Sequence, residues 1–276
     1  MENIQMEKNL KLLMKEYIED FLKKQKDPNL SKVIVENSIP IVWFGDIDKY
    51  SKSKKKIVTV ALNPSFNEFY KKDKETSKKD VVKRFEIVDF KEGITDENIF
   101  CLKETLCNYF KGNPYNKWFN WPEYALNVLG ATYYSSPKYK EISKDIINEF
   151  DTAIHIDVVT AIATDPTLSK IDLIAEGNTD KLKNVDLFKK LIKFLDPDII
   201  MISVNDEDEE EILSLFPDCC FKLTGERSQI RGKYEKKVSI RRYESDNKKL
   251  FWISPWKSSA FAQSHDFIKE NIKELM

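Results

Sequence analysis

An apolar run that stops at an Asn-Pro-Ser turn constrains the fold of this chain more than any other feature. Residues 57–62 read Ile-Val-Thr-Val-Ala-Leu and are followed directly by Asn63, Pro64 and Ser65. A run of this length, rich in β-branched residues, predicts a buried strand that ends in a turn. In open α/β sheets, ligands bind just beyond the carboxyl ends of the strands. Asn63 is therefore a candidate for positioning a water or a base, although Asn-Pro is also common in ordinary turns.

Further apolar runs of strand length alternate with helical patterns along the chain. Beside 57–62, strands are expected at 153–159, 198–203 and 250–253, and a basic β-hairpin at 219–244. Strands that alternate with helices imply a largely parallel sheet with helices on both faces. The predicted fold is α/β: a three-layer α/β/α sandwich around a mostly parallel, four-stranded sheet. The expected helices lie at about 97–110, from Pro122 to Gly130, at 184–195, and after a capping Ser264.

The first 30 residues are expected to form an amphipathic helical extension. Within residues 8–25, apolar side chains recur at helical spacing on one face: Leu10, Leu13, Met14, Tyr17, Phe21 and Leu22. The rest of the chain contains no internal repeat and no flexible linker, so residues 31–276 are predicted to form one domain. Residues 67–96 are rich in Lys, Asp and Glu, which predicts a long surface loop or lid.

The composition favours a soluble cytoplasmic protein and excludes several classes of enzyme. The chain is 41% hydrophobic and 33% charged, and Glu2, Glu7 and Lys8 stand where a signal peptide needs an apolar core. No apolar stretch is long enough to cross a bilayer, so no membrane partner is expected. Only two histidines are present, which excludes a His-rich metal centre, and no cofactor or metal is expected. The sequence lacks a nucleophile-elbow motif, a phosphate loop and a dinucleotide fingerprint.

Opposite charges are segregated along the chain although the net charge is only −1. Basic residues gather at 51–56, 71–84 and 227–242, and acidic residues at 205–211. A basic cluster on a nearly neutral protein can bind phosphates locally. The alternative is that each Lys-rich stretch is a solvated face. The acidic run is explained by its place at the positive end of a helix.

Three predicted strand ends lie at one edge of the sheet: Asn63-Pro64-Ser65, Asp157-Val158-Val159-Thr160 and Ser254-Pro255-Trp256-Lys257-Ser258-Ser259. Together they resemble motifs of the uracil-DNA glycosylase superfamily. Leu62-Asn63-Pro64-Ser65 is similar to that family's first motif, in the Asn-Pro form of its mismatch-specific and single-strand-selective branches. The segment 116–119, Asn-Lys-Trp-Phe, is similar to the family's Asn-Arg-Phe-Trp helix segment. Ser254-Pro255 resembles the tail of its His-Pro-Ser-Pro loop, which enters the minor groove. Asp157 stands where the family places a base-reading Asn.

The resemblance implies a monofunctional DNA glycosylase that acts as a monomer and flips a nucleotide out of DNA to reach it. Asn63 would be catalytic, positioning water against C1′. Asp157, Ser65, Phe66 and Phe85 would bind the base. The DNA-contacting residues would be Arg84, Ser254, Lys257, Ser258, Ser259, Arg227 and Arg231. The chain departs from the family pattern in one further respect, because Trp252 and Ile253 replace the catalytic His before Ser254.

The Asp at position 157 has a chemical consequence for the base that is bound. A base-reading Asn offers one donor and one acceptor, which suits uracil, whereas an ionised Asp only accepts. The exocyclic amine of cytosine is a donor, so Asp157 favours a cytosine-type base, and a Ser at position 65 leaves room for a 5-substituent. Such an enzyme would act in base-excision repair or in defence against phages that carry modified cytosines. The alternative is that Asp157 caps the following turn.

Two other functions stay open. One is a catalytically inactive nucleic-acid-binding module on the same fold. The other is a metal-dependent nuclease that uses Asp157, Asp165 and Glu176. Of the two histidines, His155 lies between Ile154 and Ile156 and is expected in the core.

Overall fold

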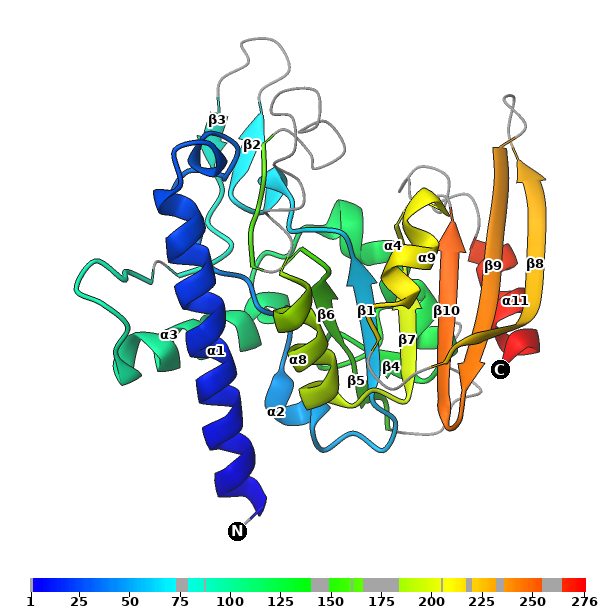
Figure 1. The fold of residues 1–276 in the computed structure, drawn as a ribbon. Helices are drawn as coiled ribbons and strands as arrows, with labels where there is room; N and C mark the ends of the chain where they lie inside the picture. Colours follow the sequence, from blue (N-terminus) through cyan, green and yellow to red (C-terminus); the bar gives the residue numbers. More distant parts are fainter. Residues whose placement is uncertain are drawn as a thin grey trace. The chain divides into compact units, whose positions relative to one another are not determined.

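The computed structural model describes ten stretches of the chain (Figure 1). These stretches fall into two compact units. The first unit comprises Met1–Phe44, Leu62–Pro114 and Asp157–Phe194, and the second comprises Gly45–Ala61, Tyr115–Ile156 and Leu195–Met276. The described residues are 2–72, 79–86, 88–139, 149–159, 161–165, 184–204, 206–216, 220–231, 236–254 and 265–276.

Three strands of a mixed six-stranded sheet are completely buried. The strand order of this sheet is β6-β1-β7-β10-β9-β8. The central strand β7 pairs in parallel with β1 and with β10, whereas β10–β9 and β9–β8 are antiparallel. The strands are β1 (Ile57–Ala61), β6 (Ile154–Asp157), β7 (Ile199–Ile202), β8 (Lys222–Arg231), β9 (Lys236–Ser245) and β10 (Lys248–Ser254).

The prediction of an α/β fold with a mostly parallel sheet is confirmed, but the prediction of four strands is wrong. The hairpin expected at 219–244 does form, as β8 and β9, and β9 pairs with β10 along the length of β10. The hairpin thereby extends the sheet from four strands to six (Figure 1). A hairpin's own pattern of residues predicts its turn and its two strands, but it does not show which third strand it joins.

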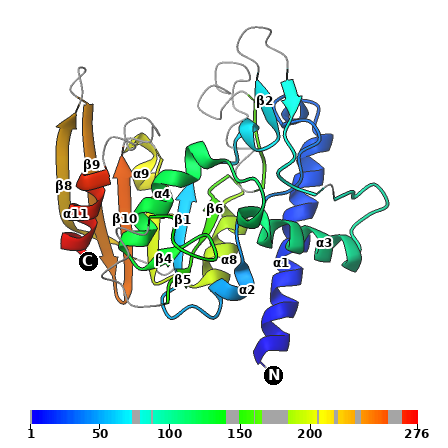
Figure 2. The same cartoon turned by 180° about the vertical axis from the view of Figure 1, so that it is seen from behind.

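Helices of the second unit lie on both faces of β9. Neighbouring residues of a strand point to opposite faces, and Arg242 donates to the Leu275 carbonyl of α11 (His265–Leu275), whereas Arg241 pairs with Glu209 of α9 (Glu209–Leu213). Figure 2 shows α11 and α4 (Asn116–Val128) lying side by side, in agreement with the packing of one helix on the other. Among its described residues, this unit also contains α2 (Ile47–Tyr50), β4 (Ala131–Thr132), β5 (Asp151–Thr152) and η4 (Asp206–Asp208).

The helix α4 begins six residues before the predicted start at Pro122. Proline inside a helix removes one backbone hydrogen bond and costs about 3 kcal/mol. This helix nevertheless buries Phe119 and Trp121 in its first half and Leu126 in its second. Burying each such side chain contributes about 1.5–3 kcal/mol, which offsets the cost of the proline. The predicted end is confirmed, because Gly130 follows with a φ of 79°.

The first unit is built around the long helix α1 (Glu2–Lys26). Its predicted apolar face is buried, and the Tyr17 hydroxyl donates to the Leu187 carbonyl of α8 (Val185–Leu195) at 3.1 Å. Segment 67–96 is not only a loop, because β2 (Tyr70–Lys72) and β3 (Lys79–Val81) form an antiparallel pair within it. The described part of the first unit also contains η1 (Leu30–Lys32), η2 (Phe66–Glu68), α3 (Asp96–Cys107) and η3 (Tyr109–Lys111). No helix of the described segments is long and apolar enough to cross a membrane.

Candidate functional site

The first predicted motif and the end of β6 lie side by side in the first unit. The backbone N–H of Val159 donates to the Leu62 carbonyl at 2.7 Å. Two residues beyond Asn63, Ser65 forms a parallel bridge with Thr164. The turn at 62–65 therefore lies next to the segment that follows Asp157 and is hydrogen-bonded to it, as expected for the carboxyl ends of neighbouring strands.

The side-chain amide of Asn63 has a defined orientation. Its Nδ2 donates to the Pro64 carbonyl at 3.1 Å and to Thr164 Oγ1 at 3.0 Å. A backbone carbonyl only accepts, so the nitrogen and not the oxygen of the amide must face Pro64. Within the described segments no group donates to Asn63 Oδ1, and the side chain is half-buried. Asn63 thus presents a fixed acceptor oxygen, which is what the positioning of a water molecule requires.

Ser65 caps the short helix η2. Its Oγ accepts hydrogen bonds from the backbone N–H and from Nδ2 of Asn67, both at 3.1 Å. The Ser65 carbonyl accepts from the N–H of Glu68 at 2.9 Å. These contacts give Ser65 a structural role in the turn. Its predicted role beside a 5-substituent stays a prediction.

A buried carboxyl group, Glu68, is the residue of this region that the sequence reasoning missed. Its side chain is only 4% exposed, and Tyr109 donates its hydroxyl to Oε2 at 2.5 Å. Burial raises the pKa of Glu68 to about 8; the Tyr109 hydrogen bond and Arg84 oppose that rise, and the charge of Asp157 adds to it. A strongly shifted carboxyl group beside a second carboxyl group is typical of functional sites. Nothing in the sequence marks this one Glu among 46 acidic residues as buried.

Arg84, which the sequence predicts to contact DNA, lies beside Glu68 in the structure. Its Nε donates to the Asn67 carbonyl at 3.2 Å and lies 3.9 Å from Glu68 Oε2, and its Nη1 donates to the Asn113 carbonyl. The side chain is 12% exposed. In this arrangement the guanidinium joins the η2 turn to the segment after η3.

The two predicted base-stacking aromatic residues have different surroundings. Phe85 is buried, with its ring stacked on Phe69 at 5.4 Å and on Tyr109 at 5.2 Å between centroids. Phe66 is half-buried, stacks on Tyr70 at 5.3 Å, and has Lys79 Nζ 5.0 Å from its ring centre. Phe66 is the more accessible of the two rings.

Asp157 ends β6 and is buried, at 6% exposure. It is close enough to Glu68 for its charge to act on that group. The structure therefore brings six predicted residues into the first unit together with the unpredicted Glu68: Asn63, Ser65, Phe66, Arg84, Phe85 and Asp157.

The other predicted DNA-binding residues belong to the second unit. Ser254 is buried at the end of β10, opposite Ser239. Arg227 donates to the Glu226 carbonyl at 3.1 Å and pairs with Glu274 at 3.4 Å. Arg231 ends β8, opposite Lys236. Lys257, Ser258 and Ser259 lie outside the described residues, as does Glu176.

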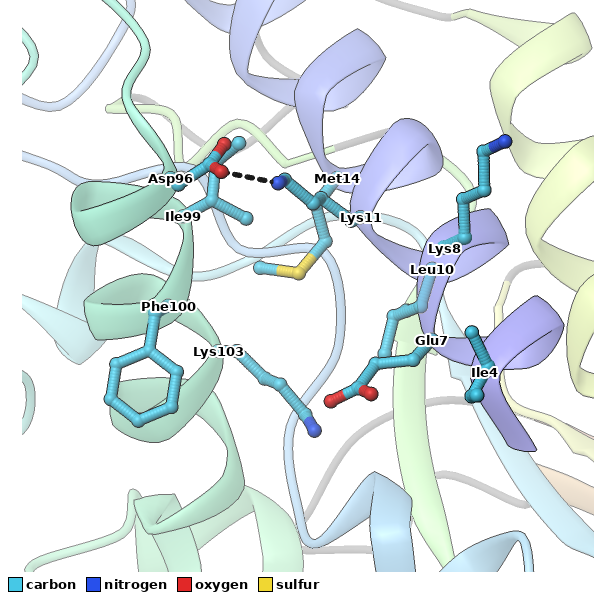
Figure 3. Close-up of a pocket in the computed structure, with 10 residues that line it drawn as sticks. All are labelled: Ile4, Glu7, Lys8, Leu10, Lys11, Met14, Asp96, Ile99, Phe100 and Lys103. Atoms are coloured by element: carbon cyan, nitrogen blue, oxygen red, sulfur yellow. Dashed lines mark ion pairs between the residues drawn. The ribbon is translucent and has the colours of Figure 1, made fainter.

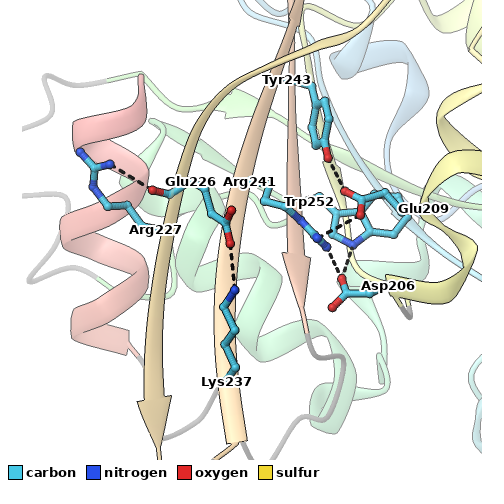
Figure 4. Close-up of polar contacts among 8 residues, drawn as sticks. All are labelled: Asp206, Glu209, Glu226, Arg227, Lys237, Arg241, Tyr243 and Trp252. Atoms are coloured by element: carbon cyan, nitrogen blue, oxygen red, sulfur yellow. Dashed lines mark hydrogen bonds and ion pairs between the residues drawn. The ribbon is translucent and has the colours of Figure 1, made fainter.

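Acidic side chains of the same protein form ion pairs with part of the predicted basic surface (Figure 4). Arg241 pairs with Asp206 and lies 3.0 Å from Glu209, and the Tyr243 hydroxyl donates to Glu209 at 2.5 Å. Trp252 Nε1 also donates to Asp206, at 3.1 Å. The acidic run at 205–211 therefore neutralises one arginine of the 227–242 stretch, in addition to its place at the start of a helix.

The prediction that His155 is a core residue is confirmed. Its side chain is buried, its Nδ1 lies 2.8 Å from Thr59 Oγ1, and its ring centre is 5.2 Å from that of Phe119. His265 stacks on Tyr124 with ring centres 3.9 Å apart, and burial lowers its pKa.

An apolar groove of about 420 Å³ lies between α1 and α3 (Figure 3). Its walls include Leu10, Met14 and Phe100, and an ion pair of 2.6 Å joins Lys11 to Asp96 at its edge. None of the predicted site residues lines it. The groove is therefore separate from the Asn63 cluster, which comprises Asn63, Ser65, Phe66, Glu68, Arg84, Phe85 and Asp157.

No group of three or more His, Cys, Asp or Glu side chains that could hold a metal ion occurs within the described ranges. Comparison with known proteins gives neither a matching family model nor a matching curated protein.

Proposed function

We propose that this protein is a monofunctional DNA glycosylase that flips out a non-standard pyrimidine and hydrolyses its N-glycosidic bond. The fixed Oδ1 of Asn63, in a turn whose Leu62 carbonyl accepts from the N–H of Val159 two residues after Asp157, is the observation that supports this best. The proposal includes a three-layer sandwich of the uracil-DNA glycosylase kind. It also includes a role in base-excision repair or in defence against phages with modified cytosines.

In this proposal Asn63 acts on the water and on the sugar. A water molecule donates a hydrogen bond to Asn63 Oδ1 and directs its lone pair at C1′. The water oxygen bonds to C1′ as the bond between C1′ and the base breaks; the electrons of the broken bond leave with the base, and the proton that the water loses passes to the base anion. In the transition state positive charge develops on the sugar, as in glycoside hydrolysis. The partial negative charge of Oδ1 stabilises this charge because the amide is already oriented by Pro64 and Thr164.

The direct test is a mass-spectrometric screen for bases released from DNA. The substrates are oligonucleotides with uracil, cytosine or 5-substituted cytosines, together with phage DNAs that carry modified bases. Release of one free base, with the sugar–phosphate backbone intact, supports the proposal. DNA binding without base release would indicate an inactive binding module, and strand cleavage would indicate a nuclease.

Exchanging Asp157 for Asn is expected to shift the preference from cytosine-type bases toward uracil. The amide restores a donor for uracil O4 and keeps an acceptor for N3–H. One switched hydrogen bond in a buried site is worth roughly 1–3 kcal/mol, or about 5- to 150-fold in relative rate. The measurement is excision from matched oligonucleotides by both proteins. If the wild type removes uracil well and ignores every cytosine derivative, Asp157 is a turn cap and not a base reader.

DNA affinity is expected to fall as salt rises, while base release persists in EDTA. The Lys and Arg residues of 71–84 and 227–242, other than Arg84 and Arg241, whose charges are paired within the protein, and Lys257 would displace counterions from the DNA phosphates on binding. The proposed hydrolysis uses a side-chain amide and carboxyl groups and no metal ion. Removing divalent ions with EDTA should therefore not slow base release. The checks are binding isotherms over a salt series and rates with and without EDTA. A flat salt profile or inhibition by the chelator would contradict the proposal.

A further inference from the structure

Glu68 lies in the short helix η2, which begins directly after the turn that contains Asn63 and Ser65. Glu68 is the last residue of η2, whose cap is Ser65, and its own N–H donates to the Ser65 carbonyl. Both of its side-chain contacts use one oxygen: Oε2 accepts from Tyr109 and faces Nε of Arg84. Oε1 therefore has no hydrogen-bond partner in the described segments. It keeps some exposure, so a ligand atom can reach it and form a hydrogen bond there.

The surroundings of Glu68 indicate where its proton would lie. The charged or titratable groups that act on it are Tyr109 on η3, Arg84 after β3, and Asp157 at the end of β6. With a pKa of about 8, Glu68 is a neutral acid at pH 7. Oε2 already accepts a hydrogen from Tyr109 and faces a cation, so the acid hydrogen belongs on Oε1. The site then has one carboxyl group that donates beside one carboxylate that accepts.

We propose that Glu68 is a second base-reading residue of this site, which donates a hydrogen bond from Oε1 to the ring N3 of a cytosine-type base. Asp157 would accept from the exocyclic amine of the same base. This inference rests on the proposed glycosylase function. It deepens that function because it supplies a two-point match to cytosine: the amine meets an acceptor, and N3 meets a donor.

Uracil fails at both points of this match. Its O4 would face the carboxylate of Asp157, and its N3–H would face the acid hydrogen of Glu68. When Glu68 loses its proton, the second mismatch disappears for uracil and a new one arises for cytosine. The preference between the two bases should therefore depend on pH, which a purely structural Glu68 would not cause.

The experiment measures excision of a 5-substituted cytosine and of uracil from matched oligonucleotides between pH 6 and 9.5. In the wild type, the ratio of the two rates is expected to be constant below about pH 7. Above about pH 8 it should fall by about tenfold per pH unit, as Glu68 ionises. Glu68→Gln keeps a donor and should give a ratio that does not change with pH. Glu68→Met keeps the volume without the donor and should lower the ratio by about 5- to 150-fold at pH 6.5.

Glu86→Gln is the matched control, because Glu86 is a surface carboxylate of the same segment, with a side chain 75% exposed. It should reproduce the wild-type profile. Thermal unfolding of each variant shows whether it is folded, and Glu68→Gln serves as the test should Glu68→Met not fold. A wild-type ratio that stays constant to pH 9.5, with bases still released, would overturn the inference about Glu68 alone. Release of no base from any substrate would instead overturn the glycosylase proposal, and this inference with it.

Discussion

Replacing Asn63 with alanine is expected to slow base release by about 100-fold or more while leaving the protein folded. The loss of one oriented polar group that stabilises developing charge typically has an effect of this size. The side chain is half-buried, and its two hydrogen bonds are to a carbonyl and a hydroxyl, so the change in stability should be about 1–2 kcal/mol. The measurement is the single-turnover rate on the best substrate, together with thermal unfolding.

Asn67→Ala is the matched control for this experiment. Asn67 lies in the same turn and donates its side-chain amide to Ser65, but nothing in the proposal assigns it to the water or the base. Its removal should change the rate by no more than a few-fold. Asn63→Asp adds a second comparison, because its carboxylate keeps an acceptor but would face the Pro64 carbonyl, which cannot donate. A wild-type rate in Asn63→Ala would remove Asn63 from the mechanism.

The central strands could be predicted from sequence because their side chains are buried on both faces. The runs that became β1, β7 and β10 are nearly continuous apolar stretches, which is typical of the parallel part of a sheet. In the hairpin, by contrast, β8 is largely exposed, and the pairing of β9 with β10 depends on tertiary contacts. Local patterns carry little information about such pairing.

The same distinction holds for the candidate site. Asn63 could be selected because it stands where an apolar run ends, and Asp157 because it stands where the glycosylase motif has a base-reading Asn; the structure places both in one unit beside the Leu62–Val159 hydrogen bond. Glu68 and Arg84 lie in a charge-rich stretch where burial leaves no periodic signal. Their pairing depends on the folding of η2 and η3 against one another, as the contact between Glu68 and Tyr109 shows.

Replacing Glu123 with alanine is expected to lower the free energy of unfolding by about 3–5 kcal/mol, without any direct effect on the Asn63 cluster. Glu123 is completely buried in α4. Its Oε1 accepts from Thr132 Oγ1 at 2.6 Å and from Asn127 Nδ2 at 2.7 Å, and its Oε2 accepts from the N–H of Tyr133 at 3.0 Å. Alanine would leave these three donors without their acceptor, and each buried unsatisfied group costs about 1–3 kcal/mol.

The pH dependence of stability gives a second way to test the role of Glu123. Burial raises its pKa above the ordinary value, and its hydrogen bonds only partly oppose that rise. The folded protein thus holds the proton more tightly than the unfolded chain, so this group's contribution to stability is complete below the ordinary pKa and declines as pH rises through the folded value. Glu123→Gln should lack that decline, although it exchanges one acceptor for a donor.

Urea unfolding at several pH values measures both the loss of stability in Glu123→Ala and the pH dependence. The exposed Glu104→Ala on α3 is the control, and its stability should stay within about 0.5 kcal/mol of wild type. An alanine variant as stable as this control would mean that Glu123 does not hold the turn after α4 together.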